Sequence, residues 1–368
     1  MRHVYLAATG QNRGKTTVSL GVLDGFGRRG LSTGFLKPVG QRTIIEDGVP
    51  ADEDAVLMRQ VFGLAEPLTQ MSPVHIPRGF TQTYIEGGVV EDLPARIRAA
   101  HAAFARDREI LVIEGTGHAG VGAVIGLSNA AVASLLGAPA VIISEGGVGR
   151  PIDEIVLNAS LFERHGVRVA GAIVNKVDLD AKPDLARTLE RGLARQGIPL
   201  LGVLPYRPIL SNPTLAMVLE GVHGETLNAG PDLDQVIGGV AIGAMEPAHM
   251  LQRIGPRSLV IVPGDRTDVI RAIVGAHVDA GSDGNGALGL VLSGGYRPDA
   301  AMVDAIRSAD LFATLVPEDT YVVASEVHDL LVKTHPADLG KIAEIKALVW
   351  EHLFIDRILG AAAAAATG

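Results

Sequence analysis

The sequence predicts an α/β protein: a doubly wound, mostly parallel sheet in the first two hundred residues, then a second, smaller α/β domain. Short, continuously apolar runs alternate with amphipathic stretches, which is typical of parallel strands buried on both faces and separated by helices. A chain of 368 residues has the length for two domains with cores of their own. Its 47% hydrophobic and 20% charged residues indicate a globular chain and not a disordered one.

Six apolar runs predict the strands of the first domain: Val4–Ala8, Thr33–Leu36, Ile110–Ile113, Ala140–Ile143, Val169–Val174 and Leu200–Leu204. Amphipathic stretches predict the helices: Thr17–Arg29, Ala51–Phe62, Leu93–Ala105, Leu127–Leu136, Pro151–His165 and Asp184–Gln196. The proline-containing segment 66–91 interrupts this alternation, as either a binding loop or a surface excursion. Ligands of doubly wound sheets bind beyond the carboxyl ends of the strands, so the residues there are the candidates for chemistry.

The first strand is followed by a glycine-containing turn, Thr9-Gly10-Gln11-Asn12-Arg13-Gly14-Lys15-Thr16-Thr17. A strand, such a turn and a helix that opens with Gly-Lys-Thr form a phosphate-binding loop, because their backbone N–H groups point at an anion. Lys15 adds a positive charge for the outer phosphates, and the Thr16 hydroxyl can ligate Mg²⁺. The first position of the usual G-x-x-x-x-G-K-[ST] pattern is Thr9 here. A lysine at a helix start is unfavourable without an anion, so a nucleotide site is favoured over an ordinary turn.

Three more residues stand where they could reach this loop. Glu114 ends the third strand, and a carboxylate at a strand tip opposite a phosphate loop is the expected second metal anchor. Lys37 ends the second strand and would point into the same crevice, although a surface lysine is the alternative. Asp54 lies in the first turn of a helix, where a capping role and a metal-ligand role are both open.

The fifth strand ends in Asn175-Lys176-Val177-Asp178, which is similar to the guanine-reading N-K-x-D of GTPases. An asparagine amide both donates and accepts hydrogen bonds, so it can read the edge of a purine. The sequence leaves the choice between adenine and guanine open.

The second half predicts a smaller α/β domain after a glycine-rich linker, Gly221–Gly230. Its expected elements are strands at Leu259–Val262 and Leu288–Leu292, helices at Asp268–Ala276, Asp299–Ser308 and Ala324–Leu331, an apolar segment at Val316–Val322, and a flexible loop at 281–286. A last amphipathic stretch, Leu339–Leu359, predicts a helix. The alanine-rich tail from Gly360 to Gly368 predicts a frayed end.

Composition excludes several classes of function. The net charge is −9 and no basic block is present, which argues against nucleic-acid binding. The absence of cysteine excludes disulfides, thiolate nucleophiles and cysteine-ligated metals. We see no signal peptide and no apolar run long enough to span a bilayer, and therefore expect a cytoplasmic protein without a membrane partner.

Together these motifs resemble the dethiobiotin synthetase family over roughly residues 1–205. The resemblance rests on the loop Thr9–Thr17, Lys37-Pro38-Val39, Asp54-Ala55, Glu114-Gly115-Thr116-Gly117 and Asn175. That family uses Mg-ATP to phosphorylate a carbamate, which then closes on itself. The resemblance implies ATP and Mg²⁺ as cofactors and these roles: Lys15 on the phosphates, Thr16, Asp54 and Glu114 on the magnesium, Lys37 on the carbamate and Asn175 on the adenine. The chain departs from the family at residues 66–91 and 118–126, so the acceptor stays open.

The second half resembles a DRTGG domain, on Gly264-Asp265-Arg266-Thr267-Asp268, Ser293-Gly294-Gly295 and Asp319-Thr320-Tyr321. Asp268-Val269 replaces the Gly-Gly of the name. The order of the two parts resembles the N-terminal regulatory region of long phosphate acetyltransferases. We therefore expect a P-loop domain at 1–210, a DRTGG-like domain at 211–360 and a low-complexity tail at 361–368.

Three functions are compatible with these features. The first is an enzyme that transfers the γ-phosphoryl group of Mg-ATP to a small-molecule carboxylate or carbamate, with Lys15 and Lys37 as the catalytic charges. The second is a regulator whose nucleotide shifts the first domain against the second or against a partner enzyme, and the third is a GTPase-like switch. The proteins it resembles are oligomeric, so we expect a homo-oligomer.

Overall fold

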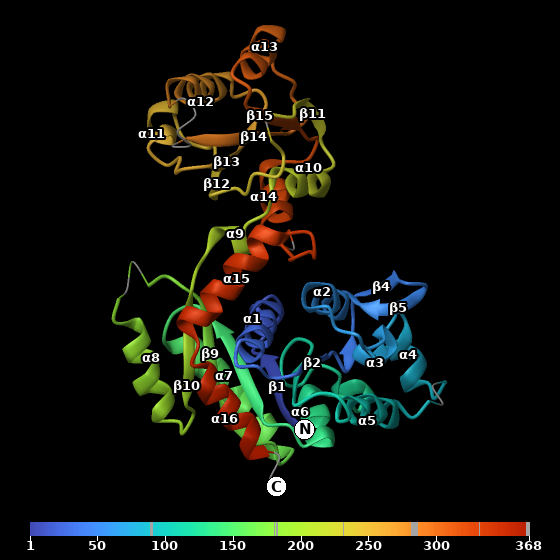
Figure 1. Cartoon of the computed structure of the whole chain (residues 1–368). Coiled ribbons are helices and arrows are strands. Elements are labelled where there is room, and N and C mark those ends of the chain that lie inside the picture. The colour runs from blue at the N-terminus through green and yellow to red at the C-terminus, as the bar shows by residue number, and fades with distance from the viewer. Residues whose placement is uncertain are drawn as a thin grey trace. The chain divides into compact units, whose positions relative to one another are not determined.

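The computed structural model describes residues 1–88, 91–179, 181, 183–230, 232–280, 286–330 and 332–365. It separates into two compact units, coloured along the chain in Figure 1. Unit 1 consists of Met1–Tyr206 and Thr334–Gly368, and unit 2 of Arg207–Lys333. Each unit is built on a mostly parallel sheet, which confirms the predicted fold class.

Unit 1 contains a six-stranded sheet in the order β10-β9-β8-β1-β7-β2, and every neighbouring pair is parallel. All six predicted strands are present, because each is an apolar run buried on both faces. They are β1 (Arg2–Ala8), β2 (Thr33–Leu36), β7 (Ile110–Glu114), β8 (Ala140–Glu145), β9 (Val169–Val177) and β10 (Leu200–Pro205).

The handedness of the crossovers places the helices on the two faces of this sheet. The connection from β1 to β2 runs in the opposite direction to the later ones, so α1 (Lys15–Gly27) covers one face and the other crossover helices cover the other. Those helices are α5 (Leu93–Phe104), α6 (Asn129–Leu136), α7 (Gly149–Arg164) and α8 (Leu185–Ala194). The helix predicted from Ala51 begins later, as α2 (Glu53–Phe62), because Asp52 closes a strand and caps the helix.

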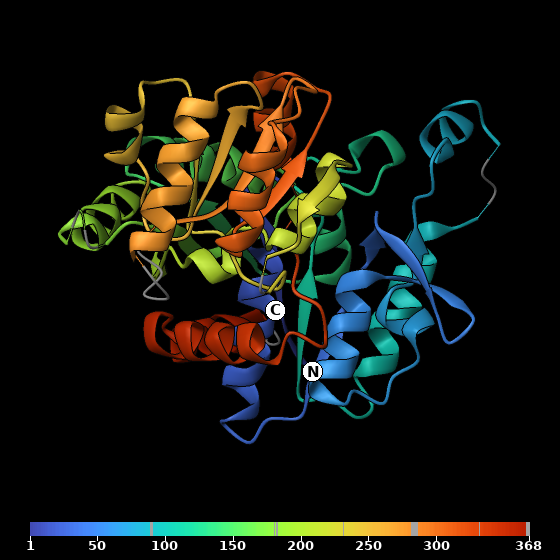
Figure 2. The ribbon, with the colours of Figure 1, turned by 90° about the horizontal axis from the view of Figure 1, so that it is seen from above.

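Two C-terminal helices return to unit 1 and lie beside α1, as both views show (Figures 1 and 2). They are α15 (Leu339–His352) and α16 (Ile355–Ala365). The approach to α1 is close: a Cβ added at Gly21 would lie 2.3 Å from the Cβ of Val349. Residues 334–365 therefore belong to unit 1, whereas we had expected them in the second domain and its tail.

The single helix expected over Leu339–Leu359 is two helices in the structure. The break falls at Leu353, which pairs with Gly202 of β10, and the N–H of Phe354 donates to the carbonyl of Leu201 at 2.9 Å. The expected frayed end is also wrong for residues 360–365, because α16 continues through them. Residues 366–368 lie outside the described part of the chain.

The segment between β2 and α5 holds short elements that the sequence did not reveal, because each is only two to six residues long. They are β3 (Val39–Gly40), β4 (Thr43–Glu46), β5 (Val49–Asp52), α3 (Leu68–Met71), β6 (Val74–His75) and α4 (Phe80–Ile85). A 3-10 turn, η1 (Ala123–Ile125), lies in the loop after β7.

Unit 2 contains a five-stranded sheet in the order β11-β15-β14-β13-β12, in which only the β11–β15 pair is antiparallel. The strands are β11 (Glu225–Asn228), β12 (Gly239–Ile242), β13 (Ser258–Pro263), β14 (Ala287–Ser293) and β15 (Phe312–Leu315). The helices α10 (Leu215–Val222) and α14 (Thr320–Asp329) cover one face, and α11 (Pro247–Leu251), α12 (Thr267–Ala280) and α13 (Ala300–Ser308) cover the other; a short α9 (Pro208–Ser211) precedes them.

Three expectations for unit 2 need correction. The supposed linker Gly221–Gly230 holds the end of α10 and all of β11, and its glycines are packed: a Cβ at Gly224 would lie 2.2 Å from Thr314 Oγ1. The segment Val316–Val322 is the turn after β15 and the start of α14, which Asp319 caps by accepting from the N–H groups of Tyr321 and Val322. The helix α12 reaches Ala280, four residues beyond its expected end. Residues 281–285 of the expected loop and Leu331 lie outside the described residues.

No helix among the described residues is both long and apolar enough to cross a membrane.

Candidate functional site

The loop after β1 has the shape that the sequence predicts. Gly14 has a φ of 89° immediately before α1, and a Cβ there would lie 2.0 Å from Asn175 Nδ2. Both the left-handed backbone and the close approach therefore require glycine at this position. As a result, α1 begins at Lys15 with its first N–H groups facing the loop.

Asn175 and Lys176, at the end of β9, hold this loop from the other side. The Asn175 amide donates to the Arg13 carbonyl at 3.1 Å, and its oxygen accepts from the Lys176 N–H at 2.9 Å. The Lys176 ammonium donates to the Asn12 carbonyl at 2.9 Å. Both side chains thus support the backbone of the loop, and the contact of Asn175 with an adenine stays a prediction.

Two carboxylates that sequence reasoning missed hold Arg13 and Thr9. Arg13 forms an ion pair with Glu145, at the end of β8, and lies 3.7 Å from Glu154 of α7. Glu154 also accepts from the Thr9 hydroxyl at 2.8 Å. The available signal was that Glu145 comes shortly after the fourth predicted strand, Ala140–Ile143.

Four predicted site residues meet at the carboxyl edge of the sheet. The Lys37 ammonium donates to Asp54 Oδ2 at 2.6 Å and to Glu114 Oε1 at 2.8 Å. The Thr16 hydroxyl lies 3.0 Å from Asp54 Oδ1 and 3.3 Å from Glu114 Oε1. The Lys15 ammonium lies beside them, 3.4 Å from the Gly10 carbonyl. The structure therefore brings together the two predicted catalytic lysines and the three predicted metal ligands.

Burial makes the electrostatics of this cluster strong. Burial raises the pKa of Glu114 to about 7; the charge of Lys37 acts to lower this pKa, and the negative charge of Asp54 acts to raise it. Burial acts to lower the pKa of Lys37, but Asp54 and Glu114 hold it well above its usual range. Burial, and then the charge of Lys37, lowers the pKa of Lys15 to about 8. An anion bound here would be stabilised by charges that water hardly screens.

The cluster has the oxygen donors that a magnesium ion needs. Glu114 Oε2 is buried and has no hydrogen-bond partner among the residues that the structure describes, although the nearby Ser19 hydroxyl acts to lower the pKa of Glu114. Magnesium is commonly held by one or two carboxylates together with substrate phosphates. Asp54, Glu114 and the Thr16 hydroxyl fit that pattern, although no three His, Cys, Asp or Glu side chains gather into a metal group within the described residues.

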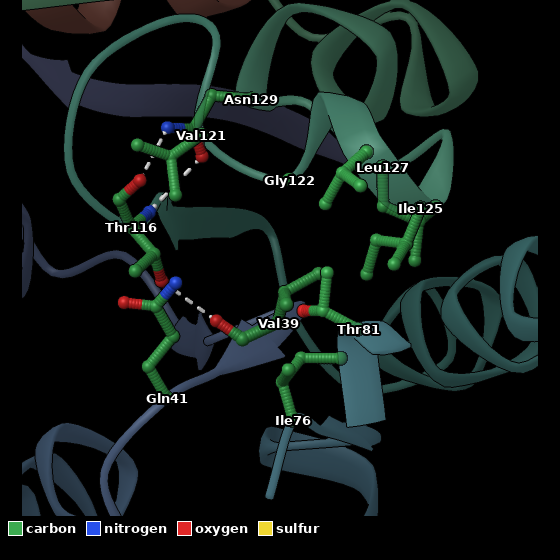
Figure 3. Close-up of a pocket in the computed structure, with 11 residues that line it drawn as sticks. Val39, Gln41, Ile76, Thr81, Thr116, Val121, Gly122, Ile125, Leu127 and Asn129 are labelled. Atoms are coloured by element: carbon green, nitrogen blue, oxygen red, sulfur yellow. Dashed lines mark hydrogen bonds between the residues drawn. The ribbon is translucent and has the colours of Figure 1, made fainter. Parts of the chain in front are cut away.

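A small pocket of about 70 Å³ is lined by Val39, Gln41, Thr116 and Asn129, and the Thr116 hydroxyl donates to the Val39 carbonyl at 2.7 Å (Figure 3). Its other walls come from Ile76, Thr81, Val121, Gly122, Val124, Ile125 and Leu127. The pocket includes parts of the two regions, 66–91 and 118–126, in which the sequence departs from the family pattern. Val39 and Thr116 follow Lys37 and Glu114 closely in the chain, so the pocket lies next to the cluster.

Asn129 is a site residue that sequence reasoning missed. Its oxygen accepts from the Tyr5 hydroxyl at 2.8 Å and from the Thr116 N–H at 3.0 Å. Its amide donates to the carbonyls of Thr116 and His118, both at 2.7 Å. The bonds to Thr116 and His118 hold the loop that follows Glu114, and the bond from Tyr5 ties Asn129 to β1. In the sequence, a polar Ser128-Asn129 pair before an apolar helix is typical of an ordinary helix cap. The pair therefore gives no sign that Asn129 holds the loop after Glu114.

Comparison with known families decides the membership of the chain. The AAA domain family matches residues 2–214, and the DRTGG domain family matches residues 217–330. The chain belongs to the AAA domain family. This match covers the whole first part of unit 1, including the loop after β1, and the DRTGG match falls within unit 2.

Curated relatives of this AAA–DRTGG chain are phosphate acetyltransferases. That of Pseudomonas putida is 27% identical over 96% of the chain and 51% of its own length, and that of Nitrosomonas europaea is 24% identical over 96% and 50%. The chain thus spans about half the length of the curated relatives it matches. Among solved structures, the MinD cell division protein of Aquifex aeolicus covers 57% of the chain with 14% identity and a TM-score of 0.36, with 84% of its own chain matched.

Proposed function

We propose that unit 1 binds Mg-ATP at the loop after β1 and transfers the γ-phosphoryl group to a carboxylate or carbamate. The observation that carries the proposal is the meeting of Lys15, Thr16, Lys37, Asp54 and Glu114 at one edge of the sheet. These residues come from four separate segments of the chain. Ionisable groups gathered in a buried cluster at a strand edge are typical of a functional site.

Each residue has a task in this proposal. The N–H groups at the start of α1 and the Lys15 ammonium hold the phosphates, and Thr16, Asp54 and Glu114 supply oxygens to the magnesium. Magnesium, when bound, neutralises charge on the phosphates. Lys37 stabilises the charge that develops between the acceptor oxygen and the phosphorus as that bond forms and the bond to ADP breaks. The pocket beside Thr116 holds the acceptor.

The second candidate is a nucleotide-responsive regulator. The DRTGG domain and the phosphate acetyltransferase relatives favour it, because the chain matches only half of each relative. In this form, bound nucleotide biases the contacts of the protein with a partner enzyme. The expected cytoplasmic location and homo-oligomer are part of both candidates, and light scattering tests the oligomer.

Calorimetry and turnover of the full chain test the proposal. ATP binding is measured with Mg²⁺ for the wild type and Lys15→Ala, with Lys346→Ala on α15 as a matched charge control. Loss of a charged hydrogen-bond donor predicts an ATP affinity about 10- to 100-fold weaker for Lys15→Ala. The ATP affinity of the control should equal that of the wild type.

The outcomes separate the candidates. Turnover that depends on an added amine with bicarbonate, or on a carboxylate, supports the enzyme, whereas binding without turnover supports the regulator. A preference for GTP would indicate the GTPase-like switch. If neither nucleotide binds, the proposal fails.

A further inference from the structure

We propose that Lys37 is an internal competitor of the divalent cation: metal binding displaces its ammonium from Asp54 and Glu114 and releases it toward the neighbouring pocket. The inference rests on the proposed function, because it concerns how the same cluster is controlled. It implies an order in which the metal complex binds first and an anionic acceptor second.

The first argument is the geometry of the carboxylates. The Lys37 ammonium is within hydrogen-bond distance of one oxygen of each, Asp54 Oδ2 and Glu114 Oε1, and its side chain is 5% exposed. The Thr16 hydroxyl, the third oxygen donor, faces the remaining oxygen of Asp54 and shares Glu114 Oε1 with the lysine. A cation of this chain therefore lies among the oxygens that a magnesium ion would need.

The second argument is charge. A divalent ion that binds these oxygens at 2.0–2.1 Å, the usual magnesium distance, would stand next to the ammonium in a buried site. Two cations that share one pair of carboxylates repel each other strongly where water does not screen them. Lys15 lies beside the same cluster and adds to the repulsion. Lys37 is the ammonium that bonds both carboxylates, so it is the one that must then move.

The third argument is the direction of release. The backbone of Lys37 is fixed, because its N–H donates to the Met71 carbonyl at 2.7 Å and Pro38 follows. Only the side chain can move, and its remaining acceptor is the Gly115 carbonyl at 3.5 Å. Gly115 leads directly into Thr116, which lines the pocket together with Val39. The released ammonium thus gives the pocket a positive charge, which suits an acceptor that is a carboxylate or carbamate.

Binding of Mn²⁺ alone to the full chain tests this inference. Mn²⁺ takes the same oxygen ligands as Mg²⁺, and its free ion is counted by electron paramagnetic resonance. We expect Lys37→Met to bind Mn²⁺ about tenfold more tightly than the wild type, a coupling of ordinary size. Lys346→Met removes an ion-paired lysine elsewhere in unit 1 and should leave the affinity unchanged. Equal or weaker binding by Lys37→Met overturns the inference.

A measurement on the wild type covers the case in which Lys37→Met does not fold. Acetic anhydride modifies accessible lysines, and mass spectrometry gives the rate for each one. Mg²⁺ should speed the labelling of Lys37 several-fold relative to Lys346 in the same digest. An unchanged or slower rate overturns the inference. Neither assay contains nucleotide, so these results stay separate from the test of ATP binding.

Discussion

The two sheets end in glycine-rich loops at their carboxyl edges, but the loops are built differently. In unit 1 the edge gathers buried charged side chains, Lys15, Lys37 and Glu114. In unit 2 the loops bind one another through the backbone: Gly264 N–H donates to the Ser293 carbonyl at 3.0 Å, and Gly294 N–H to the Glu318 carbonyl at 2.7 Å. No charged side chain is buried in the part of unit 2 that the structure describes.

The comparison shows that similar glycine-containing loops have different structural roles in the two units. Gly14 gives the loop of unit 1 a shape that leaves the N–H groups of the helix start available to a ligand. Gly264 instead allows close packing, since a Cβ there would lie 1.8 Å from the Tyr296 carbonyl oxygen. The N–H groups of Gly264, Gly294 and Gly295 are consumed within unit 2. The loop of unit 1 thus leaves the N–H groups of a helix start facing outward, whereas the loops of unit 2 use theirs to bond one another.

The largest effect should come from Gly264→Ala. The added methyl group collides with backbone that cannot rotate away, and we expect unit 2 to lose about 3 kcal/mol of unfolding free energy. Trp350, the single tryptophan, lies in unit 1, so its fluorescence follows unit 1 while circular dichroism follows both units. Urea unfolding should shift in dichroism and not in fluorescence.

Gly275→Ala is the matched control, because this glycine of α12 has open space around it and should gain about 0.5–1 kcal/mol. If the fluorescence transition of Gly264→Ala shifted as much as its dichroism transition, the substitution would destabilise both units. That result would contradict the prediction that it acts on unit 2 alone.

Gly14→Ala should weaken ATP binding for the same steric reason that Gly264→Ala should lower the stability of unit 2. The methyl group would collide with Asn175 Nδ2, and the left-handed backbone would be strained. We expect ATP affinity to fall about 100-fold, which corresponds to ~2.7 kcal/mol, as measured by calorimetry. Gly30→Ala shares the left-handed φ but has free space, so its ATP affinity should stay at the wild-type value. Normal ATP affinity in Gly14→Ala would contradict the role given to this glycine.

Asn129→Asp should show how strongly a side chain contributes to holding the loop after Glu114. The substitution removes both amide donors, to Thr116 and His118, and we expect unit 1 to lose about 2 kcal/mol in urea unfolding followed by Trp350. Asn158→Asp removes one such bond, to the Glu154 carbonyl, and should cost about half as much. Equal losses in the two variants would argue against the special role of Asn129.

The smallest effect concerns the opposite edge of the unit 1 sheet. His3 Nδ1 and His101 Nε2 lie 3.0 Å apart, and burial, followed by the charge of His3, lowers the pKa of His101 to about 4. The unfolded state therefore binds more protons between pH ~6.5 and ~4, so unit 1 loses stability as the pH falls through that window and is unaffected above it.

Because His101 is partly exposed, we expect only ~1 kcal/mol, or about 2–4 °C in the melting temperature. His101→Gln should reduce the loss of stability that unit 1 shows as the pH falls. A dependence of stability on pH identical to that of the wild type would refute the assignment. The effect should not depend on ATP, because the pair lies at the edge away from the loop.

The sequence was sufficient for the long elements and for the cluster. The strands of unit 1 are runs of apolar residues whose burial leaves no alternative, and Lys37 and Glu114 stand at the ends of two of them, whereas Asp54 lies in the first turn of α2. The shared carboxyl edge of a parallel sheet then brings such residues together. The fold class and the resemblance to phosphate acetyltransferase regions were confirmed by the structure and the comparisons.

The rest depends on tertiary contacts that a single sequence does not encode visibly. An amphipathic pattern in residues 339–359 shows that one face is buried, but not that it packs on α1. In the sequence, Gly221 and Gly224 look like parts of a flexible linker, but in the structure neighbouring side chains pack closely against both. The roles of Asn129 and Glu154 arise from hydrogen bonds between residues far apart in the chain.

The insertion of unit 2 between β10 and α15 has a consequence for how the protein can be divided. A shorter polypeptide that stops near residue 214, where the AAA match ends, would lack Val349 and Ile355, which pack on α1, and leave one side of that helix bare to water. Such an uncovered apolar stripe promotes self-association. A polypeptide in which a linker joins residue 206 to residue 334 would keep the helices that cover α1, and is the smaller form of this protein to attempt.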